Sequence, residues 1–304
     1  MLDCICLRSN YLCMEHPDVE DVARCGLRNC DGIIAISDFS RRDYLDYFSY
    51  DQTIQAKASQ VVYISTDFGN GALADIREEV PFERYDLVIG NPFKHKALDR
   101  ALAAVSDAET NYVFVGLPED AQLPENVVAF PNAQLEGSFL DALYANCDSV
   151  VFPSQYEGFG LPITIAFRHG KRVIVCDNDL NHEIEEHFPR LRENVLFFSS
   201  FEEIPTLSAR ARKEGVLSGG LTDSWQGAIV EVEAFLKRIL DHPIDWFAVD
   251  RRQWGYRLIQ EKMQNAEDRI GFKRLIWKRF IKGHRIRERL YRRFMRGETG
   301  VESL

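Results

Sequence analysis

Short apolar runs alternate with helical patterns along most of the chain. Segments 38–48, 96–105, 137–145, 161–169 and 201–213 place apolar residues at helical spacing and are long enough for two to four turns. Short, continuously apolar strands between helices are typical of βαβ units. The pattern therefore predicts an α/β fold with a doubly wound parallel sheet. The apolar runs are GIIAIS, VVYIS, DLVIG, YVFVG, NVVAF, SVVFP, RVIVC and NVLFF.

One stretch between the second and third runs lacks any consistent periodicity. It carries Gly69, Gly71 and Pro81, so we predict a linker there. About 65 residues precede it, too few to close a Rossmann half alone, and we expect them to be the remnant of an N-terminal Rossmann-like domain. The predicted parts are 1–65 as this partial α/β segment, 66–84 as linker, 85–220 as a complete Rossmann-like domain, 221–247 as a closing helix and 248–304 as a basic helical tail.

Composition narrows the class of protein. A chain of 304 residues that is 45% hydrophobic and 28% charged is expected to be globular rather than disordered. We see neither a run of about 20 apolar residues nor a signal peptide, which predicts a cytoplasmic protein. The cysteines number seven, which is odd, and five of them lie in the first thirty residues, so we expect reduced thiols rather than a disulfide framework or a zinc site.

Charge is distributed unevenly. The net charge is −10, yet residues 269–304 contain twelve Lys and Arg against three acidic residues, with apolar residues at helical spacing. From Arg269 to Arg296 we therefore expect a basic amphipathic helix that contacts an anionic membrane surface, or that packs on the acidic body or a partner subunit. No aromatic platform accompanies the charge, so nucleic acid is not an expected partner.

The segment 150–177 is the most informative for chemistry. It reads as a strand, a loop with Gly158, Phe159 and Gly160, a helix with Pro162 in its first turn, and a second strand. A helix that begins at the end of a strand presents free N–H groups, and the glycines let an anion approach the backbone. The pattern indicates a phosphate-binding turn.

Four stretches together resemble glycosyltransferase family 4, whose members are retaining enzymes of GT-B fold. SQYEGFGLP is similar to the donor-binding signature, and DLVIGNPFKHKALDRALAAV resembles the start of the family's C-terminal domain. CDGIIAISDFSRRDYLDYF and LEGSFLDALYANCDSVVFPS are also similar to family segments. The resemblance covers roughly 31–240.

The resemblance implies a role for each matching residue. Glu157 is expected to hydrogen-bond a hydroxyl of the donor sugar, and Lys96, with Asn91, is expected to hold the pyrophosphate. These groups neutralise a leaving nucleoside diphosphate without a metal, so neither metal nor cofactor is expected. The main chain of Gly158, Phe159, Gly160 and Leu161 is expected to donate hydrogen bonds to the sugar and phosphates.

The chain departs from the family at one motif position. The family has a second glutamate eight residues after the first, which binds the ribose, and here that position is Ile165. We expect either that Thr164 or Glu183 holds the ribose, or that nucleotide affinity is reduced. A competing pattern, Asp177-Asn178-Asp179, matches the metal-binding motif of GT-A enzymes, but the surrounding segments resemble the other fold.

The resemblance implies a hexosyltransferase-type enzyme. It would transfer a sugar from a nucleoside diphosphate sugar to an unidentified acceptor with retention, in polysaccharide or glycolipid synthesis, in the cytoplasm or peripherally at the inner face of the membrane. The acceptor half of a GT-B enzyme is mostly missing from this sequence, and three explanations remain open. The reading frame is truncated, a second chain supplies the acceptor domain, or the protein is a degenerate transferase. Two other functions also remain open, a non-catalytic nucleotide-sugar-binding or scaffolding subunit and a membrane-surface adaptor acting through the tail.

Overall fold

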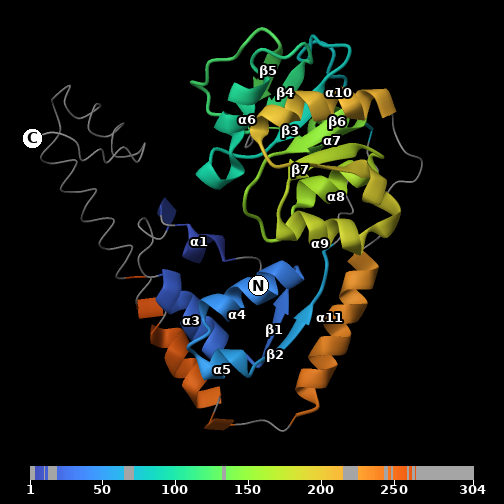
Figure 1. Cartoon of the computed structure of the whole chain (residues 1–304). Coiled ribbons are helices and arrows are strands. Elements are labelled where there is room, and N and C mark those ends of the chain that lie inside the picture. The colour runs from blue at the N-terminus through green and yellow to red at the C-terminus, as the bar shows by residue number, and fades with distance from the viewer. Residues whose placement is uncertain are drawn as a thin grey trace, which may run out of the picture. The chain divides into compact units, whose positions relative to one another are not determined.

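The structure is a computed structural model that describes residues 4–9, 11–12, 19–64, 72–131, 135–214, 225–242, 246–247, 249–258, 260–261 and 264 (Figure 1). Its internal contacts divide the chain into two compact units. The first comprises residues 1–5, 33–49 and 58–241, and it contains the large sheet. The second comprises residues 6–32, 50–57 and 242–304.

The large sheet of the first unit is parallel throughout. Its order is β5-β4-β3-β6-β7-β8, so the chain starts in the middle, moves to one edge, and returns to build the other half. This order is that of a doubly wound Rossmann-type sheet, and it confirms the predicted fold class. Among the described residues, the strands are β3 (Asp86–Ile89), β4 (Tyr112–Val115), β5 (Val127–Phe130), β6 (Ser149–Phe152), β7 (Arg172–Cys176) and β8 (Val195–Phe198).

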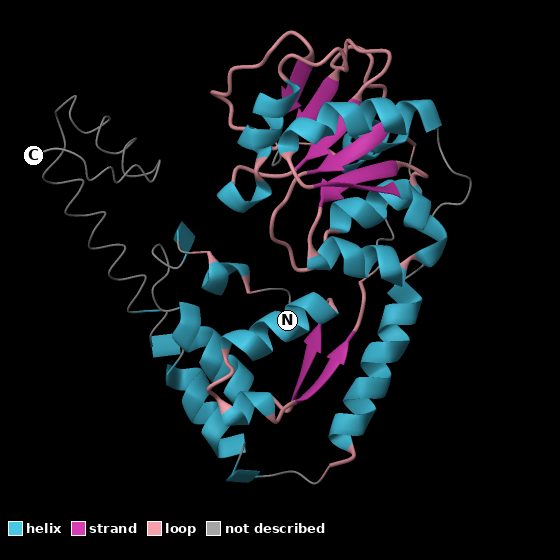
Figure 2. Cartoon of the chain, in the orientation of Figure 1, coloured by secondary structure: helices cyan, strands magenta, loops and turns pink. Residues whose placement is uncertain are grey.

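Helices cover both faces of this sheet (Figure 2). The helices α6 and α10 pack on one face, while α7, α8 and α9 pack on the other. Their bounds are α6 (Leu98–Val105), α7 (Gly137–Asn146), α8 (Leu161–Arg168), α9 (Asp179–His187) and α10 (Ile204–Glu214), with short 3-10 segments η1 (Lys94–Lys96), η3 (Pro189–Asn194) and η4 (Phe201–Glu203).

The alternation of side chains along each strand builds two cores. In β3, Leu87 and Ile89 belong to the core under α7, α8 and α9, whereas Val88 belongs to the core under α6 and α10. Because helices cover both faces of the sheet, side chains that point to either face are buried. The strands are therefore continuous apolar runs in the sequence. Each such aliphatic side chain contributes roughly 1.5–3 kcal/mol on burial.

The remaining elements of the first unit include a two-stranded sheet. It pairs β1 (Gly32–Ala35) with β2 (Ala58–Val61), so β2 begins three residues before the predicted run VVYIS. Val62 still bonds to Ala35 through its N–H, but the ring of Tyr63 stacks on His187 of α9 instead of continuing a strand. Helix α4 (Asp38–Tyr47) begins after Ser37, as predicted.

The structure describes part of the predicted linker and part of the predicted closing helix. Residues 72–84 form turns without a helix or strand, and Ile76 and Val80 among them are buried against the sheet. Helix α11 (Trp225–Leu240) lies within the segment 221–247 that is expected to be a closing helix. The exact domain boundaries stay predictions.

The second unit is helical in its described part. Helix α3 (Val19–Asn29) contacts α5 (Gln52–Gln55) and a helical stretch at 249–258. In that stretch Gly255 packs closely against Cys25, and Arg252 forms two 2.5 Å bonds to Asp31. Helix α1 (Ile5–Arg8) starts where the first unit's initial segment ends. The predicted basic tail from Arg269 to Arg296 lies outside the described residues.

Candidate functional site

Lys96 and Glu157 meet at the carboxyl edge of the large sheet. Lys96 ends η1, which follows β3, and Glu157 lies in the loop after β6. The strands β3 and β6 are neighbours at the point where the strand order reverses, which is where open α/β sheets bind ligands. The Lys96 ammonium donates to Glu157 Oε1, and each side chain is 15% exposed. The ammonium also lies 5.9 Å from the ring centroid of Phe152.

The two loops that carry these residues are joined by their backbones. Gln155 N, in the loop after β6, donates to the His95 carbonyl at 2.8 Å, and within the same loop the Ser154 hydroxyl donates to the Tyr156 carbonyl at 3.1 Å. Burial, assisted by the neighbouring charge of Lys96, lowers the pKa of His95 to about 4. His95 is therefore a neutral imidazole at pH 7, and Lys96 provides the positive charge at this place.

Two glycines bring the carboxyl ends of β3 and β4 close together. Gly116 has φ +104°, and a Cβ there would lie 2.2 Å from the carbonyl oxygen of Gly90. Asn91 follows, and its Oδ1 accepts a hydrogen bond from Phe93 N at 3.1 Å, which closes an Asx turn. Asn91 thus shapes the loop toward Lys96, and its contact with donor phosphates stays a prediction.

The glycine loop leads directly into α8. Gly160 precedes the helix at φ +91°, a left-handed conformation that suits glycine, and no side chain caps the first turn. Leu161 starts the helix and is exposed, while the ring of Phe159 is buried in the core. The loop is anchored by this ring, and its backbone stays at the sheet edge beside the positive end of α8.

The next turn of α8 faces inward. Thr164 is fully buried, and its hydroxyl donates to the Leu161 carbonyl at 2.9 Å. Ile165 is partly buried against the core. The structure thus places the Thr164 hydroxyl in a bond within the helix, and a contact between Thr164 and the ribose stays a prediction.

Glu183, the other residue considered for the ribose, binds the start of α4. Its carboxylate accepts hydrogen bonds from Asp38 N at 2.6 Å, Phe39 N at 2.7 Å and the Tyr63 hydroxyl at 2.9 Å. Sequence reasoning missed this arrangement because Glu183 and α4 are about 145 residues apart. The only local signal was Ser37 as a helix cap.

The same end of α4 contacts the glycine loop. The hydroxyls of Ser37 and Ser40 donate to the Gly158 carbonyl at 2.5 Å and 3.0 Å. The Tyr156 hydroxyl donates to the Asp43 carboxylate further along the helix. The part of the chain before the linker therefore contributes to the surroundings of Glu157.

The acidic motif after β7 has local partners. Asn178 caps α9 by accepting from Asn181 N at 2.9 Å, and Asp177 bonds to His182 at 2.7 Å. Across the described ranges, no group of three or more His, Cys, Asp or Glu side chains is arranged to hold a metal ion.

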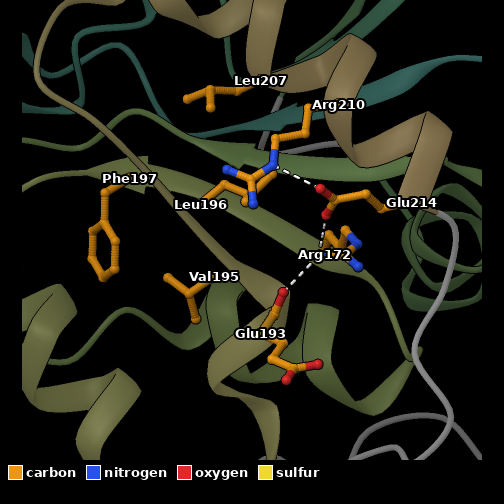
Figure 3. A pocket seen from close by; sticks show the side chains of 8 residues that line it. All are labelled: Arg172, Glu193, Val195, Leu196, Phe197, Leu207, Arg210 and Glu214. Atoms are coloured by element: carbon orange, nitrogen blue, oxygen red, sulfur yellow. Dashed lines mark hydrogen bonds and ion pairs between the residues drawn. The ribbon is translucent and has the colours of Figure 1, made fainter.

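A cavity of about 470 Å³ lies elsewhere on the sheet (Figure 3). Arg172 and Val195 line it and begin β7 and β8, so it lies at the amino edge, opposite to Lys96 and Glu157. Glu214 pairs with Arg172 at 3.1 Å and with Arg210 at 2.8 Å, so one carboxylate is shared by two guanidinium groups. This cavity is separate from the candidate site.

Comparisons with known proteins bear on this site. A search of curated proteins finds no match. Among solved structures, sucrose-phosphate synthase from Thermosynechococcus elongatus is 15% identical, with a TM-score of 0.45, covering 70% of this chain and 59% of the other. Anabaena HepE in complex with UDP and glucose is 17% identical, with a TM-score of 0.47, covering 79% and 66%.

WaaG, a glycosyltransferase involved in lipopolysaccharide biosynthesis, is 13% identical, with a TM-score of 0.41, covering 72% and 61%. This chain thus spans less than two thirds of the length of each of the three structures. A family model, glycosyl transferases group 1, matches residues 85–207, the part that contains both Lys96 and Glu157. The matched residues contain every strand of the large parallel sheet, so this sheet is the part of the chain that is similar to the glycosyl transferases group 1 family.

Proposed function

We propose that this chain is a glycosyltransferase, or the donor-binding part of one, that moves a sugar from a nucleoside diphosphate sugar to an acceptor with retention of configuration. The observation that carries the proposal is the contact between Lys96 and Glu157 beside the uncapped start of α8. The family match over the same residues supports it. Polysaccharide or glycolipid synthesis is the role we propose for the reaction.

The ion pair gives both charges a partner before the donor arrives. A single charge buried to this extent would be costly, whereas a pair is compensated. In the proposed complex, Lys96 turns to the pyrophosphate and Glu157 accepts a hydrogen bond from a sugar hydroxyl. Each group exchanges one partner for another, so donor binding leaves neither charge unpaired.

The chemical step requires stabilisation of a departing diphosphate. The C1–O bond of the donor breaks and its electron pair leaves with the diphosphate, so negative charge grows on the phosphate oxygens. The acceptor's nucleophilic atom forms the new bond to C1 on the same face of the sugar, and its proton passes to the departing phosphate oxygen. In the proposed complex, the Lys96 ammonium and the main-chain N–H groups from Gly158 to Leu161 stabilise that charge. We propose no metal and no further cofactor for this step.

The nucleotide is expected to bind weakly. Ile165 offers no hydrogen-bond acceptor where a glutamate would bind the ribose, and a lost charged hydrogen bond costs about 1.5–3 kcal/mol, or one to two orders of magnitude in affinity. UDP-glucose is the first donor to test, because the HepE structure contains UDP and glucose.

We also propose peripheral contact with the cytoplasmic face of an anionic membrane. Trp246, Trp254 and Tyr256, in and beside the helical stretch 249–258, are 71%, 68% and 64% exposed. Amphipathic aromatic rings of this kind partition into the lipid interface, and the basic sequence from Arg269 to Arg296 would add electrostatic attraction. Nowhere in the described residues is a helix both long and apolar enough to cross a membrane.

We propose that the acceptor is bound by a part of the enzyme other than the large sheet. In a GT-B enzyme the acceptor binds to a second Rossmann-like domain, and in our proposal a second chain supplies that domain. A non-catalytic scaffold and a membrane adaptor are not favoured by the family match.

A thermal-shift measurement tests the donor site directly. Purified chain is heated with UDP-, GDP-, ADP- or dTDP-sugars, and Lys96→Ala is the matched variant. A ligand at about 100 times its Kd adds about 2.7 kcal/mol, which raises the Tm by several degrees. A shift that requires Lys96 supports the proposal. If none of the four kinds of donor raises the Tm, the chain alone does not bind a donor, and the proposal is contradicted.

A further inference from the structure

We propose that Ser37, Ser40 and Glu183 are positioning residues that fix the loop carrying Glu157. They act through the Gly158 carbonyl and the start of α4 rather than through contact with a ligand. The expected effect of these residues on donor binding rests on the proposed function. The fixing of the loop itself is independent of any ligand.

Two hydroxyls share a single carbonyl oxygen. Ser37 and Ser40 are both buried, and their Oγ atoms lie 2.5 Å and 3.0 Å from the Gly158 oxygen. A carbonyl oxygen has two lone pairs, so both are occupied. In a planar trans peptide the N–H points opposite to the C=O, so the direction of Phe159 N–H is fixed as well.

Glu183 fixes the helix that carries the two serines. Its carboxylate accepts the N–H groups of Asp38 and Phe39, and the Ser37 hydroxyl accepts that of Ser40 at 2.9 Å. A negative carboxylate at the positive end of a helix is the favourable arrangement. Because Ser37 accepts from Ser40 N, its own proton remains available for the Gly158 carbonyl.

Tyr63 braces Glu183 from the other side. Burial and the adjacent Glu183 carboxylate raise the pKa of Tyr63, so its hydroxyl stays protonated and donates to Glu183. The Tyr63 ring stacks on His187 at 3.7 Å and lies 6.0 Å from the ring of Phe159. The carboxylate is therefore held in place by groups that also approach the loop.

The loop is held on the other side of Glu157 as well. Tyr156 bonds to Asp43 through its hydroxyl, and its ring meets Phe39 edge-on at 5.6 Å. Both neighbours of Glu157 in the sequence thus contact α4. The direction of the Glu157 carboxylate consequently depends on α4, which lies outside the segment that matches the family model.

The first test measures the loop without any ligand. Amide hydrogen exchange is followed by mass spectrometry in the full chain, in Ser40→Ala and in Glu183→Gln. We expect faster exchange across 156–161 in both variants and unchanged exchange in β4 and β7. Ser208→Ala is the matched control for a buried serine, because Ser208 bonds to Tyr112 at 3.2 Å away from the loop. Glu186→Gln is the control for an exposed glutamate on the same helix as Glu183.

The second test measures the affinity of the same proteins for UDP-glucose by calorimetry. The loss of one hydrogen bond that positions the loop is expected to weaken binding roughly three- to tenfold in Ser40→Ala. The Tm of this variant should fall no more than that of Ser208→Ala, whose affinity should remain that of the unmodified chain. An effect on affinity at equal stability separates positioning from a general loss of structure.

Each outcome has one meaning. Unchanged exchange at 156–161 in both variants overturns the inference, whatever the donor result. Faster exchange with unchanged affinity for a donor that the unmodified chain binds also overturns it. Faster exchange in a chain that binds none of the UDP-, GDP-, ADP- or dTDP-sugars leaves the fixing of the loop supported and contradicts the proposed function instead.

Discussion

The ammonium group of Lys96 contacts the carboxylate of Glu157, although the two residues are 61 positions apart in the chain. A ligand that binds the ammonium must therefore compete with the carboxylate, and a ligand that binds the carboxylate must compete with the ammonium. This predicts opposite effects on two related ligands when the carboxylate is neutralised, because the variant Glu157→Gln frees the lysine but weakens contact with the sugar.

In Glu157→Gln we expect UDP to bind as tightly as before or more tightly, and UDP-glucose to bind more weakly. In Lys96→Ala both ligands should bind ten- to a hundredfold more weakly, since a charged hydrogen bond is lost. Calorimetric titration of the two ligands measures all four values. Equal weakening of both ligands in Glu157→Gln would exclude a role for Glu157 at the sugar.

A side chain at position 160 is expected to destabilise the fold. Its φ is +91°, and a Cβ would lie 3.1 Å from the side chain of Ile163, so Gly160→Ala should lower the free energy of unfolding by roughly 1–2 kcal/mol. Gly137→Ala is the control, because Gly137 starts α7 and a Cβ added there would have nothing within 4 Å. Urea unfolding measures both, and an equal loss in the two variants would contradict the prediction.

Asp86 is expected to make the stability of the fold depend on pH. Burial raises its pKa to about 6, opposed by the charge of Arg212 and by bonds from Ser149. Between about pH 4 and 6 the folded chain keeps this proton while the unfolded chain loses it, so stability falls as pH rises through that window. Above pH 6 the cost remains, on the order of 3 kcal/mol.

Asp86→Asn removes this ionisation and keeps an acceptor for Ser149. The variant should gain stability relative to the unmodified chain as pH rises from 4 to 7, and the exposed Asp107→Asn should not. Urea unfolding at several pH values gives the difference curve. A difference between the two chains that is the same at pH 4 and pH 7 would show that Asp86 does not titrate in this range.

The exposed aromatic residues near the helical stretch 249–258 are expected to bind lipid. Replacing Trp246 and Trp254 with serine should lower the fraction of protein that sediments with vesicles of phosphatidylglycerol and phosphatidylcholine, by about tenfold in partition coefficient. Trp225→Ser, a change at an exposed tryptophan of α11, is the control. If the double variant sediments as well as the unmodified chain, these tryptophans do not contact the membrane.

The large sheet could be predicted because its strands are buried on both faces. Runs such as those around Val88 and Val151 are apolar throughout and are punctuated by glycine or proline, so their ends are clear. Helix α9 was missed, since it is rich in acidic residues and only Leu180 and Ile184 mark its buried side. A short amphipathic helix of that kind resembles a polar loop in sequence.

The candidate site could be predicted only in part. Lys96 and Glu157 each follow a strand, and carboxyl ends of parallel strands share one edge, so their proximity follows once the strand order is known. The contacts of Ser37 and Glu183 depend on tertiary packing over more than a hundred residues, which no local pattern encodes. Sequence reasoning accordingly found the groups expected to touch the donor and missed those that hold them.

The adjacency of β3 and β6 also affects how the fold is reached. The two strands pair only after the chain between them, which contains β4 and β5, has looped back, and closing a long loop is entropically slow. Lys96 and Glu157 are consequently separate in any intermediate that lacks this central pairing. A nucleotide sugar would then leave the refolding rate of the chain unchanged and slow its unfolding, so it would act as a kinetic stabiliser of the finished sheet rather than as a template for its assembly.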